Sequence, residues 1–199
     1  MNLPFLMQDC LRRVKERKIE TIVLAVIFLC FIVLGICCVS NPAIYDYHYN
    51  ICERYIDAVC YTDRNVFVIF LERSCGSLLL LMLTLLAGVH FAACIVPVAI
   101  LCYRAYTFGG SIFVLFGVYR FSGALIAVVL YLPIHLLTDV ILLAAIALSF
   151  TRGRCFCFHK ASFCEMLYDF LLLGALILLV YFLEMILLLF IFHPIGNII

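Results

Sequence analysis

Residues Ser74–Tyr103 read SCGSLLLLMLTLLAGVHFAACIVPVAILCY, without one aspartate, glutamate, lysine or arginine. Three further runs are long and nearly free of charge: Thr21–Ser40, Phe121–Phe150 and Phe170–Phe192. A helix needs about 20 apolar residues to cross a hydrocarbon core of ~30 Å. The runs do not alternate in polarity, as the strands of a membrane β-barrel do. The sequence therefore predicts an all-α fold, a polytopic helical bundle in a membrane.

The overall composition agrees with this class. Hydrophobic residues make up 68% of the chain and charged residues 13%, whereas soluble domains are about 45–50% apolar and about 25% charged. The net charge of +1 provides no basic surface for nucleic acid. We see no internal repeat and no room for a soluble domain. Residues 1–199 are therefore expected to form one membrane domain whose main partner is the lipid bilayer.

The distribution of lysine and arginine predicts the topology. In short loops, positive charge accumulates on the cytoplasmic side of the membrane. Residues 1–20 are expected in the cytoplasm because they carry five basic residues before the first apolar run: Arg12, Arg13, Lys15, Arg17 and Lys18. Residues 41–65, rich in tyrosine and acidic residues, are then an extracytoplasmic loop. Residues 151–166 hold the second basic cluster and are expected to be a cytoplasmic loop.

A short segment, Tyr106–Val118, decides the number of crossings. If Arg104 and the 151–166 loop both lie in the cytoplasm, the chain between them must cross the membrane an even number of times. Phe121–Phe150 provides one crossing, and Tyr106–Val118 either provides the other or is re-entrant. Its small residues allow helix backbones to approach closely, within the chain or with a partner: Gly109, Gly110 and Gly117. About five transmembrane helices are predicted.

Several features predict an irregular bundle. Pro97 lies in the second apolar run and Pro133 in the fourth, and proline removes a backbone donor and tends to kink a helix. Residues 64–73 mix apolar and charged side chains and are expected to form an interfacial amphipathic helix. Arg104 and Arg120, which flank the short segment, are expected to extend toward opposite interfaces.

Three ionisable residues inside the apolar runs are the candidate functional residues, because such groups are costly at membrane depth. His135 and Asp139 are four residues apart, so on a helix they share one face and can bond to each other. Glu184 must face the bundle interior, be protonated or meet a cation, and His135 is one candidate partner. The cluster is either a proton or ion path or a structural polar cluster that fixes helix packing. The residues themselves leave both alternatives open.

Cysteines and motifs give no sign of a metal site, a cofactor or catalysis. Cys52 and Cys60 lie in the predicted extracytoplasmic loop, where they either form a disulfide or remain reduced. The spacing of a second group is poorly suited to zinc: Cys155, Cys157, His159 and Cys164. The motifs G-x-S-x-G and H-E-x-x-H and the P-loop are missing. We therefore expect no enzyme, no catalytic residue, no metal and no cofactor.

The order of proline and glycine residues in the apolar sequence resembles a known family. Val96-Pro97-Val98 is followed by Tyr103-Arg104-Ala105-Tyr106-Thr107-Phe108-Gly109-Gly110, by Gly117-Val118-Tyr119-Arg120-Phe121-Ser122-Gly123 and by Leu132-Pro133-Ile134-His135. In this order the chain resembles the stage II sporulation protein M family over essentially its whole length. It departs from the family after Pro133, where the family typically has Gln-Asn. Glu184 and Pro194 are also farther apart than the corresponding family residues.

The resemblance implies a non-enzymatic scaffold in a bacterial cell membrane. Such a scaffold would recruit and localise peptidoglycan-remodelling partners, the stage II sporulation proteins P and D, during engulfment in sporulation. The alternative hypothesis is a small permease, channel or transport-associated component that uses His135, Asp139 and Glu184 as an intramembrane polar site.

Overall fold

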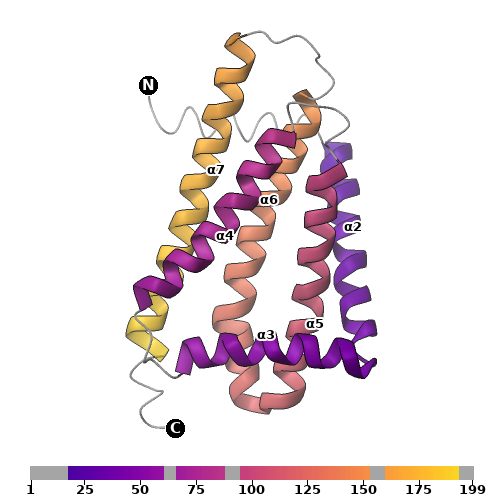
Figure 1. Ribbon diagram of the computed structural model, residues 1–199, viewed down its shortest axis with the longest axis vertical. Coiled ribbons are helices and arrows are strands. Elements are labelled where there is room, and N and C mark those ends of the chain that lie inside the picture. The colour runs from indigo at the N-terminus through magenta and orange to yellow at the C-terminus, as the bar shows by residue number, and fades with distance from the viewer. Residues whose placement is uncertain (1–17, 61–65, 88–94, 153–159, 193–199) are drawn as a thin grey trace.

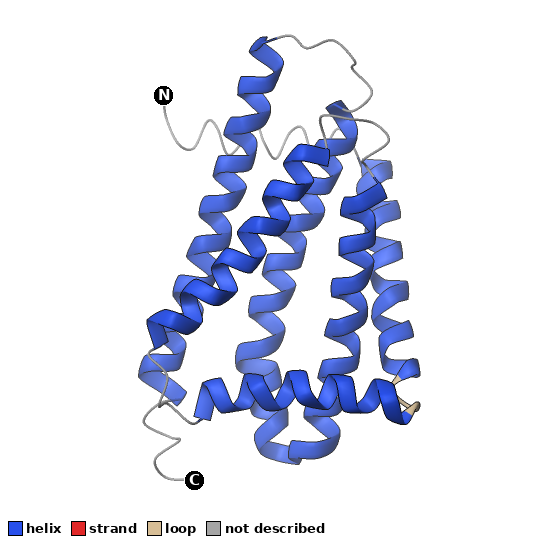
Figure 2. Ribbon diagram, viewed as in Figure 1, coloured by secondary structure: helices blue, strands red, loops and turns tan. Residues whose placement is uncertain are grey.

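The computed structural model describes residues 18–60, 66–87, 95–152 and 160–192, which are helical apart from a turn at 39–41 (Figure 2). Five helical segments are long and apolar enough to cross a membrane, so the chain is a multi-pass membrane protein. They are Lys18–Cys38, Val66–Ala87, Ile95–Phe121, Gly123–Ser149 and Met166–Phe190. The prediction of an all-α polytopic bundle is confirmed.

The long helices α2, α4, α5, α6 and α7 run up and down the bundle, and α3 lies across one end of it (Figure 1). They comprise α2 (Lys18–Cys38), α3 (Pro42–Cys60), α4 (Val66–Ala87), α5 (Ile95–Ile126), the π-helical η2 (Ala127–Tyr131), α6 (Leu132–Arg152), α7 (Lys160–Leu187) and the π-helical η3 (Leu188–Phe192). The start of α2 and the adjoining ends of α6 and α7 lie at the same end of the bundle. This agrees with the prediction that the two basic segments, 1–20 and 151–166, lie on the same side of the membrane. That this side is the cytoplasm stays a prediction.

The predicted second and third crossings had the wrong boundaries. The run Ser74–Tyr103 is not one helix, because α4 already begins at Val66 and ends at Ala87, and α5 begins at Ile95. Tyr106–Val118 is therefore the middle of a long helix and is neither a short helix nor re-entrant. Residues 66–73 belong to the spanning α4 and not to an interfacial helix. Continuous apolar sequence carries little signal for where one helix ends and the next begins, which explains these errors.

The two prolines have different effects. Pro97 lies in the first turn of α5, where a missing N–H costs little because that turn has no acceptor for it. The predicted kink at Pro97 is therefore wrong. Pro133 lies two residues after the end of the π-helical turn η2. In a π-helical turn each N–H bonds one residue farther back than in an α-helix, and this change of register accommodates a proline that has no N–H to donate. The chain reverses just before this, at Arg120, whose φ of 46° and ψ of −121° interrupt α5.

The predicted loop 41–65 is largely the helix α3, which lies across one end of the bundle (Figure 1). Asn41 caps its start: the side-chain Oδ1 accepts from the backbone N–H of Ala43 at 3.1 Å, and Pro42 occupies the first helical position. The side chains on one face are buried, at helical spacing: His48, Cys52, Tyr55 and Ile56. Among the described residues, α3 therefore has the amphipathic character that was predicted for residues 64–73.

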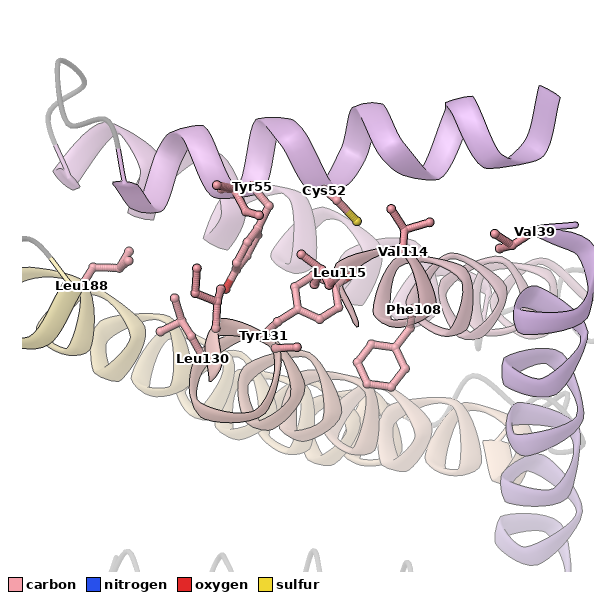
Figure 3. Packing of buried hydrophobic residues seen from close by; sticks show 12 residues of the cluster. Val39, Cys52, Tyr55, Phe108, Val114, Leu115, Leu130, Tyr131 and Leu188 are labelled. Atoms are coloured by element: carbon pink, nitrogen blue, oxygen red, sulfur yellow. The ribbon is translucent and has the colours of Figure 1, made fainter. Parts of the chain in front are cut away.

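The buried face of α3 packs on the hairpin formed by α5, η2 and α6. Figure 3 shows Cys52 and Tyr55 pointing from α3 toward the cluster that includes Val114, Leu115 and Tyr131. The Cys52 thiol donates to the carbonyl of Ser111 at 3.3 Å. Burial raises the pKa of Cys52 to about 12, so the thiol stays neutral and packs as an apolar group.

Small residues let α2 and α5 pack at close range. A Cβ on Gly109 would meet the backbone carbonyl of Ile32, and a Cβ on Gly35 would meet that of Tyr106. Gly110 makes room for the ring of His48, whereas a Cβ on Gly117 would meet nothing within 4 Å. Gly109 and Gly110 therefore serve packing within the chain, and the structure gives no such role to Gly117.

We expect Gly109→Ala to destabilise the protein by about 1–3 kcal/mol, because the new methyl group must push α2 and α5 apart. Gly117→Ala is the matched control on the same helix. It has open space and gains helix propensity, so it should be neutral or slightly stabilising. Thermal unfolding of the purified variants in mild detergent measures both, and equal unfolding temperatures would contradict the close crossing.

Candidate functional site

Two buried ion pairs lie inside the helical bundle. Arg104 on α5 donates through Nε to Oδ1 of Asp139 on α6 at 2.6 Å. Arg73 on α4 pairs with Glu184 on α7. The two pairs join four different spanning helices, and each places a cation against a carboxylate that water hardly reaches: Asp139 is 1% exposed and Glu184 is 3% exposed.

Both pairs lie at membrane depth. Arg73 lies about 10 Å along α4 from Val66, and Glu184 lies about 9 Å from the end of its span at Phe190. Asp139 lies about 24 Å along its span from Gly123 and about 15 Å from Ser149. The Arg73–Glu184 pair is thus nearer the α3 end of the bundle, and the Arg104–Asp139 pair is near the middle.

Hydroxyl groups occupy the space between the two pairs. Arg104 donates through a terminal nitrogen to Oγ of Ser77 at 3.4 Å. Ser77 in turn shares a hydrogen bond of 2.7 Å with the hydroxyl of Tyr181. Arg73 and Ser77 are four residues apart and so share one face of α4, which places the Arg73–Glu184 pair next to the hydroxyl groups that reach Arg104.

Tyr55 of α3 contacts the Arg73–Glu184 pair. Its hydroxyl donates to Oε1 of Glu184 at 3.5 Å, and the Arg73 guanidinium lies 4.3 Å from the centre of its ring. Burial, with a smaller contribution from the Glu184 charge, raises the pKa of Tyr55, so the phenol is a neutral donor. The ring also packs edge-on against Tyr131, with 5.0 Å between centroids.

These groups, apart from Glu184, line a cavity of about 1210 Å³ between α3, α4, α5 and α6, with one residue each from η2 and α7. Its outer part carries charged side chains of α3 and α4 (Arg54, Asp57 and Glu72), and its inner part carries Arg73, Ser77, Arg104, His135, Asp139 and Tyr181. A purely structural ion pair needs no such space beside it. The arrangement provides a cavity that extends from the α3 end of the bundle to about mid-membrane, with these polar groups set among apolar side chains such as Ile69, Leu80 and Phe108.

The structure brings the three predicted residues into one region but pairs them differently. Asp139 binds Arg104 and not His135, and Glu184 binds Arg73 and not His135. The ring of His135 packs on Tyr131, with 4.2 Å between centroids, and lines the cavity. Arg104 was expected at an interface and instead points into the bundle, because α5 begins at Ile95 and so carries Arg104 into the membrane.

The sequence analysis missed Arg73, Ser77, Tyr55, Tyr131 and Tyr181. A usable signal was present for Arg73, because a charge seven residues into a helix that begins at Val66 lies inside the apolar layer. The three tyrosines and Ser77 are ordinary residues in sequence, and only the tertiary arrangement brings them together.

Of the two alternatives for Cys52 and Cys60, the structure excludes the disulfide. Cys52 and Cys60 lie on the single helix α3, where eight residues place them about 12 Å apart, too far for a disulfide. In the second group, Cys155, Cys157 and His159 lie outside the described residues. Within the described ranges, no three His, Cys, Asp or Glu side chains converge to hold a metal ion.

No family model, no curated protein and no solved structure matches this chain.

We expect Asp139→Asn to lower stability by about 3–5 kcal/mol, because it leaves the Arg104 guanidinium buried without a counter-charge. The double variant Arg104→Gln/Asp139→Asn should recover a large part of this loss, since both charges are then removed together. Thermal unfolding in detergent at neutral pH measures the double-mutant cycle. Additive losses in the double variant would contradict direct pairing of these two side chains.

Proposed function

We propose that this protein is a small membrane permease or a transport-associated membrane component that takes up a polar solute in the cavity between α4, α5 and α6. The single observation that supports this function is that the arginines of two buried arginine–carboxylate pairs line one cavity at membrane depth. Ionisable residues at such positions commonly mark substrate or ion pathways.

The arrangement of the helices provides further support. Asp139 and Arg104 connect α6 to α5, and Glu184 and Arg73 connect α7 to α4. The solute pathway would begin at the outer charged residues beside α3, pass Arg73 and end near Arg104. Movement of α5 relative to α6 would then have to break or shift the Arg104–Asp139 pair, which would couple occupancy of the site to the conformation of the bundle.

Flux into proteoliposomes tests this function. We expect wild-type protein to accelerate the re-swelling of vesicles in at least one of five solutes: glycerol, glycine, sodium glutamate, sodium succinate and sodium phosphate. Arg104→Gln/Asp139→Asn, which removes both charges together, should reduce that rate by about tenfold or more, which corresponds to about 1.4 kcal/mol. Stopped-flow light scattering measures the rates.

Thr138→Val is the matched control for this assay. Thr138 is buried on α6 beside Asp139 but bonds only to the carbonyl of Ile134 among the contacts described, at 2.8 Å. Thr138 does not line the cavity, so solute flux through Thr138→Val should equal that through wild type. Wild-type vesicles that swell as slowly as protein-free vesicles in all five solutes would contradict the permease.

We propose as a second candidate the scaffold that the family resemblance implies, a membrane protein that recruits peptidoglycan-remodelling partners. The observation that favours it is the outer edge of α3, which is exposed at one end of the bundle and carries polar side chains at helical spacing: Asp46, Asn50 and Glu53. Such an edge on a firmly packed helix is a suitable surface for a water-soluble domain of a partner.

Affinity purification from mildly solubilised membranes of the native host during sporulation tests the scaffold. We expect the stage II sporulation proteins P and D to co-purify with wild type and to be lost from Asp46→Ser/Glu53→Ser. These two residues do not line the cavity, so solute flux should be unchanged in this variant. Capture of a transport ATPase instead, or of no partner, would contradict the scaffold.

A further inference from the structure

Two arginines and one carboxylate, Arg73, Arg104 and Asp139, are the charged groups that line the deep part of the cavity. Arg73 is 20% exposed and its partner Glu184 only 3%. Arg104 is 15% exposed and its partner Asp139 only 1%. In both pairs the arginine is therefore the more exposed partner. Glu184 does not line the cavity, and Asp139 lines it but is nearly inaccessible, so a molecule that enters meets mainly N–H donors.

From this geometry we propose that the cavity binds the anionic group of its ligand, a carboxylate or a phosphate, between Arg73 and Arg104. The inference rests on the proposed solute-binding function and adds the chemical class of the solute. A guanidinium carries five N–H donors in a planar fork. Arg104 uses Nε for Asp139 and a terminal nitrogen for Ser77, which still leaves N–H groups that can bind an acceptor oxygen.

The neighbouring groups suit an anion. The hydroxyls of Ser77 and Tyr181 share a hydrogen bond of 2.7 Å and can turn a proton toward an acceptor, as hydroxyl groups rotate freely. A cation in the same place would face two guanidinium groups, and could reach a carboxylate only by displacing its arginine. That displacement would leave a charge unpaired at membrane depth, which is costly.

The charged side chains nearer the α3 end give no long-range attraction for an anion. Arg54, Asp57 and Glu72 line this outer part and together carry one net negative charge, so they do not attract anions from a distance. Selectivity for an anion must therefore arise from direct contact with Arg73 and Arg104. The cavity volume of about 1210 Å³ is ample for a small organic anion, because pockets for such ligands are about 300–1,000 Å³.

Gly76 provides a position from which the charge preference can be measured. It lines the cavity between Arg73 and Ser77, and a Cβ there would meet nothing within 4 Å. A cysteine at this position therefore fits without strain. Leu79, on the same helix, is 60% exposed and does not line the cavity, so Leu79→Cys is the matched control that faces lipid.

The experiment compares two thiol reagents of similar size and opposite charge on Gly76→Cys. The background carries Cys75→Ala, because Cys75 is the adjacent native thiol, and the protein is reconstituted in phosphatidylcholine vesicles. The probes are sulfonatoethyl and trimethylammonioethyl methanethiosulfonate. Peptide mass spectrometry measures each rate at residue 76, and each rate is divided by the rate of the same reagent with a small free thiol.

We expect the normalised rate to be higher for the anionic reagent by about fivefold or more, a difference that one nearby guanidinium charge can supply. Arg73→Gln/Glu184→Gln should reduce this preference, whereas Arg73→Lys, which keeps the charge, should preserve most of it. Inorganic phosphate should slow the labelling of residue 76. Leu79→Cys should react slowly with both reagents.

The outcomes separate the inference from the proposed function. If neither reagent reaches residue 76, the cavity is closed to water, and both the function and the inference are wrong. If both react and the cationic reagent is faster, the inference is wrong and the open cavity stands. If phosphate has no effect and only phosphatidylglycerol vesicles protect residue 76, the anionic group belongs to a lipid, which supports the anion site and contradicts a permease.

Discussion

The cost of placing charge inside a membrane is the constraint on which the structure depends. Arg73 and Arg104 each lie within a spanning helix, and each is opposed by one carboxylate from another spanning helix. An unpaired charge at this depth costs several kcal/mol, so each pair fixes which helices are neighbours. Lipid is as apolar as the helix surfaces, so apolar contacts alone discriminate weakly between arrangements. The two ion pairs, together with the close packing of α2 and α5 at Gly35 and Gly109, select the observed arrangement of the helices.

The helix α3 connects this charged interior to the end of the bundle. It places Tyr55 over Arg73 and beside Glu184, while Cys52 and His48 fix it against α5. A short extracytoplasmic loop could not do this, because only a packed helix holds a tyrosine in a fixed place above an ion pair. The same helix has an exposed polar edge. The two proposed functions therefore use opposite faces of one element and can be tested independently.

The sequence predicted the class of fold and the depth of Asp139 and Glu184, because long apolar runs and rare charges are strong local signals. It failed at the boundary between α4 and α5. Residues 74–103 are apolar throughout, so nothing local indicated that Ala87 ends one helix and Ile95 begins another. Because of that one error, Arg104 was predicted at an interface and Arg73 outside the membrane. The partners of Asp139 and Glu184 were therefore not recognised. With the correct boundary, two arginines and two carboxylates at similar depth would have suggested the pairs. The contributions of Tyr55, Ser77 and Tyr181 depend on tertiary packing, and no local pattern indicates them.

The proposed function requires a water-filled cavity that extends from the α3 end to about mid-membrane. Hydroxyl-radical footprinting of the unmodified protein in lipid nanodiscs tests this most directly, because the radicals form from local water. His135 and Tyr181 line the cavity, whereas Met82 is 55% exposed on the outer surface of α4 and faces lipid. We predict oxidation of His135 and Tyr181 and protection of Met82, although methionine oxidises readily. Protection of His135 and Tyr181 together with Met82 would contradict a water-filled cavity.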